Sequence, residues 1–144
     1  MDFDTEIELN KPLGIVWAFL IDPANMHLWL GEVVRFEQKG GTKGLAGFRC
    51  RYFFSNGYVD QRIQTSDMHK KLVMTLENDS FNTNMKMVFN EQGGKTSIKI
   101  MSNTEIDVPG AAFAGNAIRS AIDTKMSTYL NRLQMAIEQQ KTTP

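Results

Sequence analysis

Three short turn signals in the middle of the chain constrain its fold more than any other feature of the sequence. Asn56-Gly57, Asn78-Asp79 and Gly93-Gly94 each separate two runs that are rich in aromatic, β-branched and methionine residues. Asparagine, aspartate and glycine are the residues that two-residue hairpin loops favour, and the length of such a loop sets the register of both strands. The three turns therefore predict a series of antiparallel hairpins.

The registers that these turns predict agree about which side chains share one face. In each hairpin the apolar positions of one strand meet the apolar positions of its neighbour, and a loop around 67–69 joins two strands with the same parity. We expect a meander of six antiparallel strands between Glu32 and about Asp107. The predicted pairs are Phe54 with Val59, Tyr52 with Gln61, Cys50 with Ile63, Leu76 with Phe81, Met74 with Thr83, Leu72 with Met85, Phe89 with Ile98, Met87 with Ile100, and Met85 with Ser102.

The two ends of the chain carry different patterns. The alternation in "DFDTEIEL" predicts a half-buried strand, and Pro12 and Pro23 each stand where a short helix can begin. The last segment, from Asp107 as N-cap and Pro109 just inside, predicts one long helix with an apolar stripe at steps of three and four. The expected fold class is α+β, with a seven-stranded antiparallel sheet, a long C-terminal helix, and two short helices after the first strand.

Composition excludes several classes of protein. The 144 residues fit one domain, 1–144, and the 16 basic residues equal the 16 acidic ones, so the basic footprint of a nucleic-acid-binding protein is missing. No apolar run approaches the ~20 residues of a membrane span, and the acidic N-terminus is unlike a secretory signal. A single cysteine fits a reducing compartment. We expect a cytoplasmic monomer or homodimer without nucleic-acid or integral membrane contact.

A comparison of widths predicts a cavity. Seven strands about 4.8 Å apart form a curved surface about 30 Å across, whereas one helix is only about 10–12 Å wide. The first half of the last helix is rich in alanine and glycine, so it cannot fill the gap. We therefore expect a cavity between the sheet and that half of the helix, lined by Phe48, Cys50, Tyr52, Gln61, Ile63, Met74, Thr83, Met85, Met87, Ile100, Phe113, Ala117, Ile118, Ala121 and Ile122. The alternative is that these residues form a packed core.

The whole pattern resembles a known superfamily. The segments "NKPLGIVWAFLIDPANMHLWLGEV", "GTKGLAGFRC" and the closing "YLNRLQMAIEQ" are similar to those of the START-like or Bet v 1-like (SRPBCC) superfamily, within it the polyketide cyclase/dehydrase-like branch. Its most specific part is the run from Pro12 to Pro23, followed by Trp29. The resemblance implies a helix-grip fold and a hydrophobic cavity for lipids, sterols, polyketides or similar compounds, with Trp29 at the cavity rim.

Evidence for catalysis in the sequence is weak. The only histidines, His27 and His69, are far apart, and one cysteine adds no metal cluster, so we expect no metal and no cofactor. The register places Asp60, Glu77 and Glu105 on the outer face, away from the cavity. We therefore favour binding or transport of a small hydrophobic ligand. The alternatives are a polyketide cyclase, aromatase or dehydratase that uses the same cavity, and a co-chaperone-like interaction module.

Overall fold

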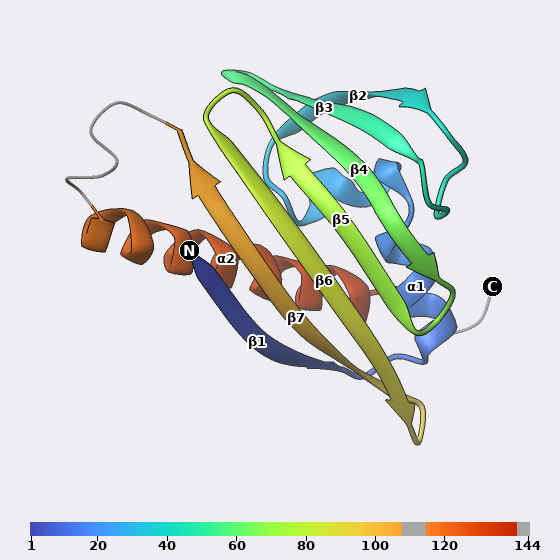
Figure 1. Ribbon diagram of the computed structural model, residues 1–144. Helices are drawn as coiled ribbons and strands as arrows, with labels where there is room; N and C mark the ends of the chain where they lie inside the picture. The colour runs from blue at the N-terminus through green and yellow to red at the C-terminus, as the bar shows by residue number, and fades with distance from the viewer. Residues whose placement is uncertain (108–114, 141–144) are drawn as a thin grey trace.

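The structure is a computed structural model that describes residues 1–107 and 115–140, with the backbone only for 115–119 (Figure 1). It contains seven strands, two α-helices and one 3₁₀-helix in the described ranges. In chain order these are β1 (Asp2–Leu9), α1 (Leu13–Leu20), η1 (Pro23–Leu28), β2 (Val33–Gly40), β3 (Arg49–Phe54), β4 (Gly57–Asp67), β5 (Lys71–Glu77), β6 (Phe81–Gln92), β7 (Lys95–Ile106) and α2 (Gly115–Glu138).

The seven strands form one antiparallel sheet in the order β1-β7-β6-β5-β4-β3-β2. The predicted six-stranded meander is confirmed, and the N-terminal strand joins it by pairing with β7. All helices lie on one face of the sheet, and α2 runs across that face (Figure 1). The expected α+β helix-grip architecture is therefore the observed one.

The predicted register is right at one hairpin. Phe89 pairs with Ile98 and Met87 with Ile100, as expected from a Gly93-Gly94 turn. Both glycines have positive φ, 59° and 77°, which is the backbone that a type I′ turn requires.

The predicted register is wrong by two residues at the other two hairpins. Phe54 pairs with Gly57, so the first loop is Ser55-Asn56, and neither of these residues has positive φ. At the next hairpin Leu76 pairs with Thr83. A shift of two residues preserves the side-chain alternation, so every predicted inward position still faces the helices.

A side-chain hydrogen bond explains the shift at the second of these hairpins. The Asn78 Oδ1 atom accepts the backbone N–H of Ser80 at 2.8 Å and that of Phe81 at 3.2 Å. Asparagine that caps its own turn in this way occupies the position before the two central residues. The central pair is therefore Asp79-Ser80 rather than the predicted Asn78-Asp79.

The short helices begin where the prolines predict. Pro12 precedes α1 in an extended conformation, and Asp22 caps η1 by accepting the N–H of Ala24 at 3.0 Å, with Pro23 as the first residue. On α2 the apolar stripe is buried at Met126, Leu133 and Ile137. The predicted helix start near Pro109 lies outside the described residues.

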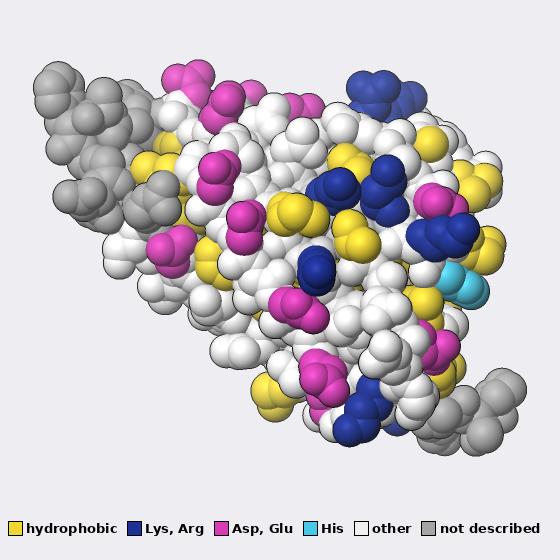
Figure 2. Space-filling view, turned by 60° about the horizontal axis from the view of Figure 1, so that its bottom comes forward, with side chains coloured by type: hydrophobic (Ala, Val, Ile, Leu, Met, Phe, Trp, Pro, Cys, Tyr) yellow, Lys and Arg dark blue, Asp and Glu magenta, His cyan; other side chains and the backbone are white. Residues whose placement is uncertain are grey.

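The outer face of the sheet is polar, as predicted. Acidic, basic and hydrophobic side chains are interspersed in the view of Figure 2. Arg51 forms a double hydrogen bond with Asp60 at 2.7 and 2.8 Å, and the Arg35 guanidinium lies 3.7 Å from the centre of the Phe53 ring. Among the described helices, none has both the length and the apolar character that crossing a bilayer would need.

Candidate functional site

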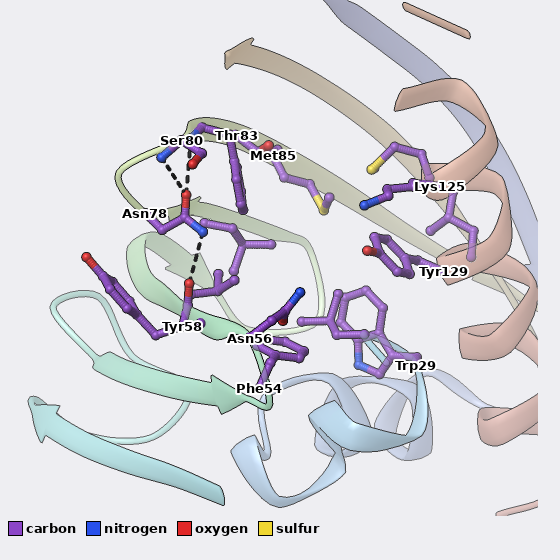
Figure 3. Close-up of a pocket in the computed structure, with 17 residues that line it drawn as sticks. Trp29, Phe54, Asn56, Tyr58, Asn78, Ser80, Thr83, Met85, Lys125 and Tyr129 are labelled. Atoms are coloured by element: carbon purple, nitrogen blue, oxygen red, sulfur yellow. Dashed lines mark hydrogen bonds between the residues drawn. The ribbon is translucent and has the colours of Figure 1, made fainter. Parts of the chain in front are cut away.

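A pocket of about 510 Å³ opens between one end of the sheet and the middle of α2 (Figure 3). Its size falls within the range of about 300–1,000 Å³ that is usual for small-molecule sites. The β3–β4 and β5–β6 turns form one side, the residues after η1 a second, and α2 a third. The lining residues are Trp29, Leu30, Phe54, Asn56, Gly57, Tyr58, Val59, Leu76, Asn78, Ser80, Phe81, Thr83, Met85, Lys125, Met126, Tyr129 and Leu130.

The pocket walls are mainly aliphatic and aromatic. Val59, Leu76 and Met85 reach it from three neighbouring strands, because each occupies an inward position of the sheet. Met126 and Leu130 face them from α2. The two walls are formed by elements far apart in the sequence, so the hollow between them depends on how the helix lies against the sheet.

Two polar side chains in the wall are already satisfied. Asn78 donates to the carbonyl oxygen of Tyr58 at 3.0 Å, in addition to accepting the two backbone N–H groups of its own turn. The hydroxyls of Thr83 and Thr104 lie 2.8 Å apart in a buried hydrogen bond. These bonds link β4 to the β5–β6 turn and β6 to β7, so they hold the mouth of the pocket in place.

Other polar groups of the lining have no such partner. The side chains of Lys125 and Tyr129 make no hydrogen bond or ion pair with any described residue, and their ammonium and hydroxyl groups point into the pocket (Figure 3). The Trp29 side chain is 2% exposed, and its Nε1 is a buried donor without an acceptor among the described residues. An unsatisfied buried donor costs about 1–3 kcal/mol.

The structure brings three of the predicted cavity residues, Trp29, Thr83 and Met85, to the pocket. Ile122 is half-buried against the core, whereas Ala121 is exposed. Phe113 and the side chains of Ala117 and Ile118 lie outside the described residues. The remaining predicted residues, all at most 5% exposed and packed in the core, are Phe48, Cys50, Tyr52, Gln61, Ile63, Met74, Met87 and Ile100.

Three of the core residues outside the pocket are linked by polar side-chain contacts. The Tyr52 hydroxyl donates to the Gln61 Oε1 at 2.6 Å, and the Gln61 amide lies 3.5 Å from the Met74 sulfur. Burial raises the pKa of the Tyr52 hydroxyl far above its ordinary value, with a further contribution from Cys50. Burial also raises the pKa of the Cys50 thiol. Both groups stay protonated and neutral at physiological pH.

Sequence reasoning missed most of the pocket lining. The sequence assigns Asn56 and Asn78 only to turns and Tyr129 only to the apolar stripe of the last helix, and nothing in it singles out Ser80. One sequence signal for this part of the lining is the spacing of four residues between Lys125 and Tyr129, which places both side chains on one face of the helix. Lys125 also borders the apolar stripe beside Met126, and no acidic residue stands three or four positions from it.

Metal or acid–base chemistry finds little support in the described residues. They contain no group of three or more His, Cys, Asp or Glu side chains that could hold a metal ion. His27 is exposed, and His69 packs edge-on against Trp17 with ring centres 5.8 Å apart, away from the pocket lining. The described lining contributes no carboxylate and no imidazole.

Comparison with known proteins identifies the fold and nothing finer. No family model matches the chain, and no curated protein matches its sequence. Solved structures do match. TTHA0849 from Thermus thermophilus has a TM-score of 0.75 and 15% sequence identity, over 95% of this chain and 97% of its own. Protein BH1534 from Bacillus halodurans has a TM-score of 0.74 and 16% identity, over 96% of this chain and 97% of its own. Ara h 8.0201 has a TM-score of 0.70 and 16% identity, over 95% of this chain and 97% of its own. The fold is Bet v 1-like.

Proposed function

We propose that this chain, with its Bet v 1-like fold, binds or carries a small hydrophobic molecule in the pocket between the sheet end and α2. The observation that carries the proposal is the pocket itself, about 510 Å³ with aliphatic and aromatic walls on opposing layers. An apolar ligand that enters it removes surface from water on both sides, and each Å² of apolar surface buried contributes about 25 cal/mol.

The walls are held in shape before a ligand arrives. The hydrogen bonds of Asn78 and the Thr83–Thr104 pair lie within the protein and need no ligand to complete them. A preformed site loses less conformational entropy on binding than a site that has to be ordered first. The geometry is therefore favourable for a carrier, which binds without changing its guest.

Binding is favoured over turnover by the chemistry of the lining. General acid–base catalysis uses groups that titrate near the working pH, mostly carboxylates and imidazoles. The described lining holds neither, and its titratable groups are one lysine and two tyrosines. For these reasons we place the cyclase-like alternative behind the binding function.

A neutral fluorescent dye, phenyl-naphthylamine, tests the proposal directly. We expect its emission to rise and saturate on titration with the protein. Val59→Trp fills the pocket from β4 and should weaken dye binding by about tenfold or more, a loss of at least about 1.4 kcal/mol. Val73→Trp is the matched control, since Val73 is also a half-buried strand valine but lies on the outer face.

The control separates loss of the pocket from loss of the fold. Circular dichroism of both variants should match the parent protein. If the dye fails to bind the parent, or if Val59→Trp binds it as well as Val73→Trp does, the pocket is not the binding site and the proposal is overturned.

A further inference from the structure

We propose that the natural ligand is an amphipathic carboxylic acid, whose apolar body occupies the pocket and whose carboxylate pairs with Lys125. This inference rests on the proposed function, because it names the class of molecule that the same pocket would take. It depends on the identity, position and partners of one side chain in the wall.

Lys125 is the only charged residue of the described lining. The other members are apolar, aromatic, hydroxyl or amide side chains and one glycine. A positive charge beside apolar walls selects for a guest with the opposite charge at one end. A cationic guest would be repelled, and a neutral guest would gain nothing from the charge.

No described acidic residue neutralises this charge. The ion pairs between described residues involve Arg35, Lys39, Lys43 and Arg51. Salt bridges within a helix form between residues three or four positions apart. The residues at those positions from Lys125 are Ala121, Ile122, Thr128 and Tyr129, so α2 itself supplies no carboxylate.

A second donor lies beside the first. Tyr129 follows Lys125 by four residues, and Figure 3 shows its hydroxyl and the Lys125 ammonium directed into the same side of the pocket. A carboxylate has two oxygens, and each can accept one of these donors. The half-buried Tyr129 ring also supplies apolar contact for the atoms next to the carboxylate.

The contribution of Lys125 is expected to be moderate and to depend on salt. The side chain is exposed, and exposed ion pairs are screened by mobile ions. A charge-assisted hydrogen bond is nevertheless about twice as strong as a neutral one. We expect removal of the charge to weaken binding of a carboxylate about fivefold at low ionic strength and less at high ionic strength.

The test compares decanoate with decanol, which share a chain and differ in charge, as competitors that displace phenyl-naphthylamine near neutral pH. Lys125→Met removes the charge but keeps a long side chain, and Lys125→Arg restores it. We expect decanoate affinity to fall about fivefold in Lys125→Met and to recover in Lys125→Arg. Decanol affinity should stay the same in all three proteins. Lys86→Met, which removes an exposed lysine from the outer face of β6, is the control and should alter neither affinity.

The outcomes separate this inference from the proposed function. If dye and decanol bind the parent but Lys125→Met leaves decanoate affinity unchanged, or weakens both competitors equally, the charge pairing is overturned and the pocket stands. If neither dye nor decanol binds the parent protein, the proposed function fails and this inference fails with it.

Discussion

The Tyr52 hydroxyl donates a 2.6 Å hydrogen bond to the Gln61 side chain in the buried core, although the two residues are not direct partners in the β3–β4 ladder. The direct partner of Tyr52 is Val59, and that of Gln61 is Cys50. The bond is therefore diagonal and bridges two positions of the inner face. Because both side chains are at most 5% exposed, water cannot replace either partner.

Removing both members of this pair should cost less stability than the sum of the two single losses. Tyr52→Phe leaves the Gln61 oxygen without its donor, and Gln61→Leu leaves the Tyr52 hydroxyl without its acceptor. Each should lower the free energy of unfolding by about 1–3 kcal/mol. The double variant should be more stable than the sum of the two losses implies, by a coupling of at least about 0.5 kcal/mol. Urea denaturation of the four proteins measures this, and strictly additive losses would contradict it.

A side chain at the second glycine of the Gly93-Gly94 turn should lower the stability of the protein. Gly94 has a φ of 77°, and a Cβ there would meet nothing within 4 Å, so the cost of Gly94→Ala is conformational. We expect a loss of about 1–2 kcal/mol. Gly14→Ala, in α1 with equally open surroundings, should instead stabilise the protein by up to about 1 kcal/mol. Thermal unfolding of both variants checks the difference in sign.

Cys50 should be inert in the folded protein. The thiol is 1% exposed, and burial raises its pKa, so little reactive thiolate is present at mildly alkaline pH. We expect negligible labelling by iodoacetamide under native conditions and complete labelling in urea. Labelling of the native protein at the rate of a free thiol would show that β3 opens readily.

Glu37 should titrate below its ordinary pKa of 4.5, first because of its hydrogen bond to Lys39 and then because of Arg35. A lowered pKa means that any stabilisation is present above the ordinary value and is lost as the pH falls through the folded-state value. An NMR titration of the side-chain carboxyl carbon measures it. Lys39→Met should raise the midpoint more than Arg35→Met does; equal midpoints in all three proteins would exclude the contact.

Trp29 should report on the pocket, and Trp17 should not. Trp29 lines the pocket, whereas Trp17 packs against Phe89 with ring centres 5.2 Å apart, and neither residue of that pair belongs to the lining. A bromine-substituted decanol quenches tryptophan fluorescence by contact. We expect quenching to persist in Trp17→Phe and to disappear in Trp29→Phe. Quenching that survives in Trp29→Phe would place the guest at the other end of the sheet.

Much of the fold was predictable because strand faces depend on a local period. The Asn56-Gly57 and Asn78-Asp79 signals misplaced each loop by one residue and each pairing register by two, yet Met74, Met85 and Gln61 still face inwards as expected. A register error of one residue would have reversed those faces. The position of the β5–β6 turn was less predictable, since the Asn78 side chain decides it through hydrogen bonds within the turn and to β4.

The sequence by itself determined the order of the six meander strands, the inward faces, the short helices and the apolar stripe of α2, because each follows from spacing along the chain and from turn chemistry. Only the tertiary structure decided where the layers separate. Phe48, Met74 and Ile100 pack into a closed core, while Val59 and Leu76 face Met126 and Leu130 across an open pocket. The distance between a sheet and the helix across it depends on the packing of all side chains between them, and no local pattern records that distance.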